Sequence, residues 1–301
     1  KTLGQLFCDN SAQDIVDILM TECEWAGVTV NLRSEVLHVA KLDSGYLVAT
    51  NNGEFQCTSL VVASGGLTMP KLGASPIGYK IAEQFGLNVL PTTAALVPFT
   101  LHEHDKERFD GLSGISIATT VTSESGVTFK ENILFTHRGL SGPAILQISS
   151  FWKAGQSVSI NLMPEAAIDD VIKEWRVSNP KKSLKNMLST ILPKSFIEAM
   201  VSQQEITDKT ISQLSNHDVT QITQYLHNWQ IKPNGTEGYR TAEVTLGGVD
   251  TDELSSKTFE AKKAPGIYFI GEVIDVTGWL GGYNFQFAWS CGMACGLAVD
   301  D

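Results

Sequence analysis

The sequence predicts an α/β protein organised around a parallel sheet, and two apolar runs carry that prediction. The run at residues 267–270 precedes a glycine loop and then a helical stretch at residues 285–298. A second run, residues 59–63, also ends in glycines. Uninterrupted apolar runs are typical of parallel strands covered on both faces. Because ligands collect at the carboxyl ends of such strands, the two runs could flank one cofactor.

The glycines of the two loops predict where a ligand could approach the backbone. Gly281 and Gly282 stand directly before the C-terminal helix, whose first amides have no partner within the helix and favour negative charge. Ser64, Gly65 and Gly66 end the other strand. The simpler alternative is an ordinary α/β unit whose glycines only allow close packing.

The N-terminal part predicts a helix followed by short strands. Ser11, with Asp14 three residues later, resembles a capping box that starts the helix, and Gly27 ends it. Asn52-Gly53 is a strong hairpin signal. The expected strands are 28–32, 35–40, 46–50, 54–57 and 87–90, with a helix at 79–85.

The middle of the chain changes character and predicts a second domain inserted into the first. Alternating strand patterns give way to polar helical stretches, and residues 92–243 form the expected insertion. Residues 1–91 and 244–301 form the first domain. The expected strands of the insertion are 95–101, 116–122, 133–136 and 157–162, and its expected helices are 169–177, 184–191, 194–203 and 211–229.

Composition narrows the class of protein. The chain has 301 residues, a formal charge of −11 and a pI near 5.0, which predicts that nucleic acid is not a partner. No apolar run is long enough to span a bilayer and no leader pattern opens the chain, so a cytoplasmic location without membrane contact is expected. Because the chain opens on Lys1 rather than Met, an upstream segment is expected. The sequence leaves the oligomeric state open.

Several familiar catalytic patterns are not satisfied. The glycine spacing at residues 73–80 places Tyr79 where a phosphate-binding loop needs lysine, and residues 139–143 end in Pro143 rather than in the glycine of a nucleophile elbow. The five cysteines show neither metal-ligand nor disulfide spacing. His102 and His104 lack a third ligand at suitable spacing, so a solvated loop is expected there.

Taken together, the motifs resemble one group of FAD-dependent oxidoreductases with the two-dinucleotide-binding fold. This group comprises aminoacetone-oxidase-like and bile-acid-reductase-like flavoproteins. The resemblance runs from about Leu3 to the end of the chain, with the motifs in the family's order. They are 61–66, 70–73, 134–143, 245–249, 271–275 and 281–284.

The resemblance implies a Rossmann-like FAD domain that is N-terminally incomplete, with an inserted α+β substrate domain. The family begins with a Gly-x-Gly-x-x-Gly segment for the FAD pyrophosphate, and the 301 residues contain none. Two alternatives follow. The chain is a flavoenzyme whose phosphate-binding segment precedes Lys1, or it is a cofactor-free fragment or paralogue that acts as a binding or structural module.

The resemblance also implies which residues surround FAD. Glu272 would accept hydrogen bonds from the ribityl hydroxyls, although it could instead be a buried carboxylate that caps a turn. The backbone around Gly282 would face the pyrimidine edge, where a helix start favours the reduced flavin. The remaining expected contacts are Val36 with adenine, Ser64, Gly65, Gly66 and Pro70 beside the cofactor, and Gly271, Asp275, Gly281, Tyr283 and Asn284 in the C-terminal loop.

The implied activity is hydride transfer between FAD and a small organic substrate, with NADH or NADPH as electron partner. His137 would pass a proton and Arg138 would hold an anionic or carbonyl group, unless their loop is purely structural. Tyr283 is an alternative proton donor, or only a packing wedge. A flavoprotein that modifies transfer RNA is a further alternative, against which the negative charge argues.

Overall fold

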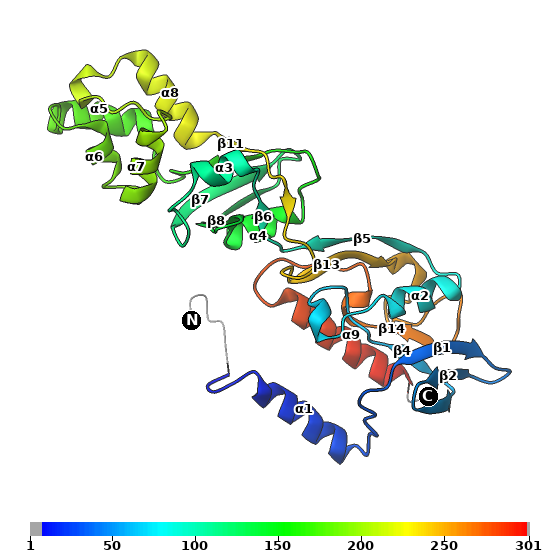
Figure 1. The fold of residues 1–301 in the computed structure, drawn as a ribbon. Helices are drawn as coiled ribbons and strands as arrows, with labels where there is room; N and C mark the ends of the chain where they lie inside the picture. The colour runs from blue at the N-terminus through cyan, green and yellow to red at the C-terminus, as the bar shows by residue number, and fades with distance from the viewer. Residues whose placement is uncertain (1–7, 300–301) are drawn as a thin grey trace.

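The computed structural model describes residues 8–299, which follow one another through three bodies in Figure 1. The first holds the C-terminal end of the described chain, the second is an antiparallel sheet, and the third is a helical bundle farthest from the C-terminus. Two large hydrophobic clusters match this arrangement, one in the first body and one shared by the sheet and the bundle. The architecture is a Rossmann-like α/β fold with a second α+β part.

The first body is built on the parallel pair that the apolar runs predicted. Strand β14 (Ile267–Phe269) pairs in parallel with β4 (Leu60–Val62). All three β14 residues are buried, as expected for a strand covered on both faces. The other elements of this body are the meander β1 (Val36–Lys41), β2 (Tyr46–Thr50) and β3 (Gly53–Cys57), then η2 (Pro70–Leu72), α2 (Ile77–Gln84), η4 (Thr251–Glu253), η5 (Gly271–Val273) and α9 (Tyr283–Val299). Helix α1 (Gln13–Trp25) precedes them, has no buried residue and lies apart from this body in Figure 1.

An antiparallel ribbon of two strands joins the first body to the sheet. Strand β5 (Val89–Ala95) leaves the first body and β13 (Val244–Val249) returns to it, paired from Val244 with Ala95 to Val249 with Val89. Both passages of the chain therefore lie side by side (Figure 1). The domain limits at residues 91 and 244 stay a prediction, and the first of them falls within β5.

The second body is a seven-stranded sheet in which every pairing is antiparallel. Helix α4 (Pro143–Ser149) packs on β7 and β8, and five of its seven residues are buried. In sheet order the strands are β11 (Trp229–Ile231), β10 (Val158–Asn161), β7 (Ser116–Ser123), β8 (Thr128–Phe135), β9 (Gly139–Ser141), β6 (Phe99–Thr100) and β12 (Gly235–Thr236).

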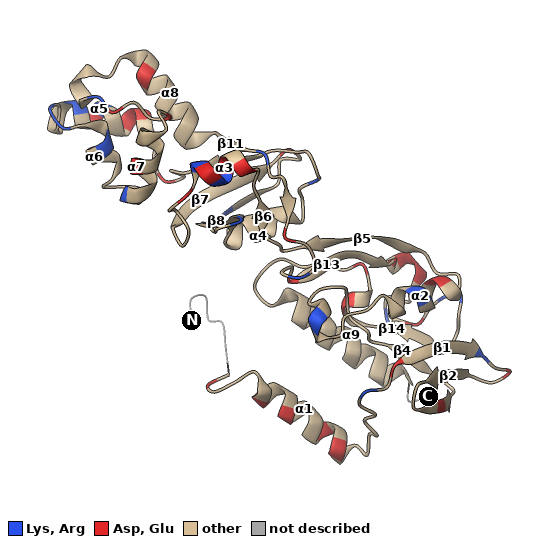
Figure 2. Cartoon of the chain, viewed as in Figure 1, with Lys and Arg blue, Asp and Glu red and all other residues tan. Residues whose placement is uncertain are grey.

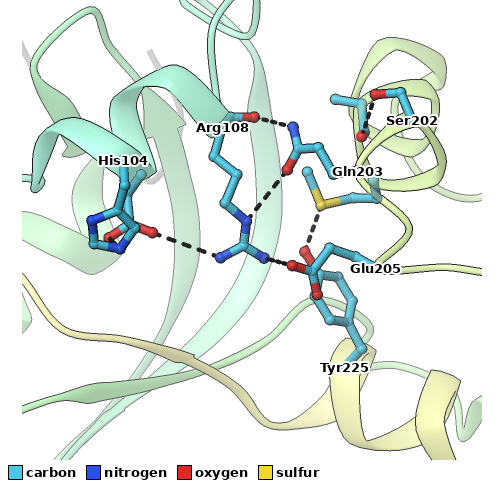
Figure 3. Close-up of polar contacts among 9 residues, drawn as sticks. His104, Arg108, Ser202, Gln203, Glu205 and Tyr225 are labelled. Carbon is cyan, nitrogen blue, oxygen red and sulfur yellow. Dashed lines mark hydrogen bonds and ion pairs between the residues drawn. The ribbon is translucent and has the colours of Figure 1, made fainter.

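The third body is a bundle of short helices with an apolar interior. Its helices are α5 (Ile168–Ser178), α6 (Leu184–Leu188), α7 (Lys194–Ser202) and α8 (Asn216–His227), with the turn η3 (Ile211–Gln213). A polar latch fixes the bundle to the sheet. Arg108, on α3 (Glu103–Arg108) of the sheet body, forms an ion pair with Glu205 and donates to Gln203 from Nε at 3.3 Å (Figure 3).

We predict that replacing Ser215 with alanine lowers the free energy of unfolding by about 1 kcal/mol, a typical cost for losing a helix N-cap. Ser215 Oγ accepts from the Asp218 amide, while the Asp218 carboxylate accepts from Ser215 in return. Denaturant unfolding would measure the loss. Replacing Ser195 is the matched control, since it is an exposed serine of the same bundle that caps no helix, and an equal effect would contradict the capping role.

Several local expectations differ from the structure. Residues 28–32 form no strand, because within residues 8–299 no neighbouring strand pairs with them. The expected capping box of α1 is not formed either, since Ser11 Oγ accepts from the Gln13 amide instead. The expected loop around His104 is helix α3, and residues 95–101 are interrupted at Leu96, whose φ is +46°.

Candidate functional site

The loop between β14 and α9 is held in shape by Asn284. Its Oδ1 accepts from the Gly278 amide at 2.7 Å and its Nδ2 donates to the Gly278 carbonyl at 3.2 Å. The clamp closes the loop directly before α9, whose first residue is Tyr283. Gly281 and Gly282 lie inside it with φ of +119° and +92°, in the region that favours glycine. The helix start is thus exposed on a preformed loop.

A cavity of about 350 Å³ opens beside this loop and brings four predicted cofactor residues together. We call it the Glu272 cavity. One wall is the loop itself. The opposite wall is formed where β5 ends and β13 begins. The predicted residues that line it are Glu272, Gly281, Gly282 and Asn284, and the others include Met69, Leu96, Glu243 and Trp279.

Two carboxylates line the Glu272 cavity. Burial raises the pKa of Glu272, and burial likewise raises the pKa of Glu243. Within residues 8–299 neither side chain forms an ion pair. Glu272 is half-buried and Glu243 is more exposed. Carboxylates without a protein donor are suited to accept hydrogen bonds from a bound molecule, and their raised pKa lets them hold a proton to a higher pH than glutamate usually does.

Unpartnered hydroxyls lie in the same region. In the described part of the chain, Tyr79 OH and Ser64 Oγ are buried and have no hydrogen-bond partner. Burial, followed by neighbouring Tyr239 and Glu272, raises the pKa of Tyr79 to about 12, so its hydroxyl remains a donor. Neither hydroxyl is on a residue that lines the Glu272 cavity. The Glu272 carboxylate and the open amides before α9 fit a ligand that carries hydroxyls and carbonyls, as the ribityl chain and pyrimidine ring of a flavin do.

Gly66, Gly78 and Asp275 have visible structural roles next to the cavity. A Cβ on Gly66 would lie 2.5 Å from Thr245 Oγ1, and one on Gly78 would lie 2.2 Å from Ser64 Oγ, so both positions need glycine. Asp275 Oδ1 accepts from the Gly247 amide at 3.0 Å and stabilises the bend in β13. A contact of Asp275 with FAD stays a prediction.

The other predicted cofactor residues do not line the cavity. Pro70 begins the turn η2 and is exposed, Val36 begins β1, and Gly65 and Gly271 have positive φ with open space beside them. Their contacts with FAD stay predictions.

The three predicted catalytic residues are not gathered at the Glu272 cavity. His137 lines a different cavity of about 450 Å³ beside α3, which shares no lining residue with it. Arg138 Nη1 lies 3.2 Å from Glu237 Oε2 in an ion pair. Tyr283 is 62% exposed. Their catalytic roles stay predictions.

The loop before α9 also contacts the sheet body. The ring of Trp279 meets that of Phe129 on β8 edge to face, with centroids 5.2 Å apart. Leu280 packs on a small cluster of ribbon residues that includes Ala95 and Leu96. In Figure 1 this loop turns towards the sheet before α9 begins. The Glu272 cavity is therefore built from the first body and the ends of the ribbon, and it lies next to the sheet body, a position where two-domain enzymes commonly hold substrate.

Glu243 is the site residue that the sequence analysis missed. The sequence pattern marked Glu243 only as the last residue of the predicted insertion, residues 92–243. A usable signal was present, because Glu243 is the one charged residue in the stretch 241–249, directly before a buried strand. A charge directly before a buried strand places a carboxylate at the edge of the core, where it can line a cavity.

Comparison with known proteins extends over almost the whole chain. A family model described as "HI0933-like protein Rossmann domain" matches residues 1–298. The chain is 59% identical over 295 residues to the ribosomal RNA dihydrouridine synthase of Escherichia coli K12, covering 98% of this chain and 74% of that protein. It is 50% identical to the ribosomal RNA dihydrouridine synthase of Haemophilus influenzae, covering 99% and 75%. It is 25% identical to the 3-dehydro-bile acid delta(4,6)-reductase of Clostridium scindens, covering 96% and 74%.

These relatives overturn the prediction that nucleic acid is no partner. Two proteins at 59% and 50% identity are named for a reaction on ribosomal RNA. The prediction failed because it used the net charge of the whole chain, whereas RNA is bound by local surfaces. Separately, none of the helices between residues 8 and 299 is long and apolar enough to cross a membrane.

Proposed function

The chain belongs to the HI0933-like family of Rossmann proteins, and from this we propose that it is a flavin-dependent enzyme that reduces a uridine of ribosomal RNA to dihydrouridine. The observation that carries the proposal is the 59% identity, over 98% of the chain, to a relative named for that product. The Glu272 cavity supports it chemically, since its acceptors and open amides suit the ribityl and pyrimidine part of a flavin.

In this proposal Glu272 holds the flavin and the start of α9 tunes it. The Glu272 carboxylate would accept from ribityl hydroxyls, which offsets the cost of its burial. The amides before α9 would face the pyrimidine edge, where the helix dipole stabilises the negative charge of the reduced ring. The flavin, when bound, supplies the hydride, with NADH or NADPH proposed as its reductant.

Reduction of uracil adds a hydride to one carbon of the C5–C6 double bond and a proton to the other. We assign the proton to Glu243, because it lines the Glu272 cavity and its raised pKa lets it keep a proton nearer to neutral pH. His137, Arg138 and Tyr283 remain alternative contacts for the substrate. Of these, Arg138 has a side chain that is 42% exposed, and it could bind an RNA phosphate in place of Glu237.

The test uses protein expressed from its complete coding sequence. Purified enzyme should be yellow, should bleach with NADH or NADPH, and should regain its colour when unmodified ribosomal RNA is added, with dihydrouridine formed in step. A colourless protein that takes up no FAD would contradict the proposal and favour the cofactor-free alternative. A yellow protein that forms no dihydrouridine would contradict ribosomal RNA as the substrate but not the flavin dependence.

A further inference from the structure

The helical bundle carries a basic segment within an acidic chain. Residues 176–194 contain five Lys and Arg and no Asp or Glu, whereas the whole chain has a formal charge of −11. Figure 2 shows blue positions gathered on the α5 to α7 end of the bundle. The segment runs from the last turn of α5 through α6 to the first residue of α7.

Contacts within the bundle bring three of the five cations close together. Arg176 Nη2 donates to the Leu214 carbonyl at 2.6 Å, and the Ser212 amide donates to the Pro180 carbonyl at 3.0 Å. These contacts place Arg176 beside the loop that carries Lys181 and Lys182. We call the whole set the basic surface, and its members are Arg176, Lys181, Lys182, Lys185 and Lys194.

The acidic groups next to the basic surface already have partners, and one of them, Glu198, compensates two members of the surface itself. Glu198 lies 3.4 Å from Lys185 Nζ and 3.9 Å from Lys194 Nζ, so one carboxylate serves two cations. Asp218 is paired with Lys209 at 2.8 Å. Asp208 accepts from the Lys185 amide.

Lys181 and Lys182 are the uncompensated cations of this surface. Both are exposed, and no ion pair involves either of them in the described part of the chain. The surface therefore has positive charge available for an external anion.

We propose that the basic surface binds backbone phosphates of ribosomal RNA. The inference rests on the proposed function and adds to it the part of the protein that holds the substrate. Lysine and arginine side chains bind phosphates independently of sequence and fix the position of the nucleic acid, while the reacting base is recognised elsewhere. The contacts of Arg108 hold the bundle on the sheet, and the Phe129–Trp279 contact joins the sheet to the loop that lines the Glu272 cavity, so the basic surface is connected to the cavity through packed elements.

The test replaces Lys181 and Lys182 together by glutamate and measures binding of an unmodified ribosomal RNA transcript at several salt concentrations. Loss of two phosphate contacts should weaken binding about tenfold or more and reduce the slope of log affinity against log salt by about two. The matched control carries Lys80→Glu and Lys257→Glu. Both lysines are exposed on the first body, and their replacement changes the net charge by the same amount as the test variant does. The control should keep most of the affinity and the wild-type salt slope.

The outcomes separate this inference from the proposed function. If the Lys181/Lys182 variant binds RNA as the wild type does, or no more weakly than the control, the basic surface is not the RNA site, although dihydrouridine synthesis can still stand. If the wild type neither binds RNA nor forms dihydrouridine, both proposals fail. Unchanged flavin colour in the variant would show that its folded flavin site is intact and that any loss belongs to RNA binding.

Discussion

Glu243→Gln should lower the rate of dihydrouridine formation by about 100- to 10,000-fold, the usual contribution of a general acid. Glutamine keeps the size and polarity of the side chain but carries no transferable proton. Flavin content should stay near that of the wild type, because in this proposal Glu243 donates the proton and Glu272 binds the flavin. Single-turnover reduction of ribosomal RNA by the pre-reduced enzyme measures the chemical step without the NAD(P)H half-reaction.

The pH dependence of the same step tests the protonation state of Glu243. Burial raises its pKa, and only the protonated form can donate. Activity should therefore fall as pH rises through this raised pKa, and Glu243→Gln should abolish that fall along with most of the rate. Glu131→Gln, at an exposed carboxylate on β8, should change neither. A wild-type rate in Glu243→Gln would remove Glu243 from the mechanism.

Glu272→Gln should weaken flavin binding by about 10- to 100-fold, because hydrogen bonds to a charged acceptor are each worth about 1.5 to 3 kcal/mol. Titration of the apoprotein with FAD, followed by flavin fluorescence, measures the change. Turnover should recover at saturating FAD if Glu272 only holds the cofactor.

The same variant should make the apoprotein more stable at neutral pH. Burial raises the pKa of Glu272, so the folded state holds the proton more tightly than the unfolded state. This contribution to stability is complete below the unfolded pKa of about 4.3 and is lost as pH rises through the raised value. Glutamine avoids that loss. Stability that falls at neutral pH, with FAD affinity unchanged, would show that Glu272 is a structural cap.

Glu253→Gln is the opposite control. A hydrogen bond from Lys263 lowers the pKa of Glu253, so its contribution to stability is present above its unfolded pKa and is lost as pH falls through the lowered value. The replacement should therefore destabilise the protein at neutral pH and leave FAD affinity unchanged. Equal changes in stability and in FAD affinity for Glu253→Gln and Glu272→Gln would contradict the different roles given to the paired and the unpaired carboxylate.

The parallel core could be predicted from sequence because its signal is local. Residues 59–63 and 267–270 are apolar without interruption, and the structure pairs strands within them in parallel. The gathering of Glu272, Gly281 and Gly282 at one cavity follows from the same logic, since all come after the end of one strand. Helix α4 was missed because its seven residues are too few to show a periodicity.

Other features depend on tertiary contacts that no short pattern contains. Residues 28–32 have strand propensity but no pairing partner within residues 8–299, so propensity alone did not make a strand. Glu243 and Glu272 are 29 positions apart in the sequence. They line the same cavity only because the β5–β13 ribbon returns beside the loop before α9. His137 was placed at the substrate by resemblance, and its own cavity could be seen only in three dimensions.

The most direct test of the central claim is nucleoside mass spectrometry of ribosomal RNA from an Escherichia coli strain that lacks its own ribosomal RNA dihydrouridine synthase. We predict that the complete coding sequence of this protein restores dihydrouridine to that RNA, and that its Glu243→Gln variant, expressed to the same level, does not. Ribosomal RNA without dihydrouridine in cells that contain the folded, flavin-bound wild-type protein would contradict the proposed function.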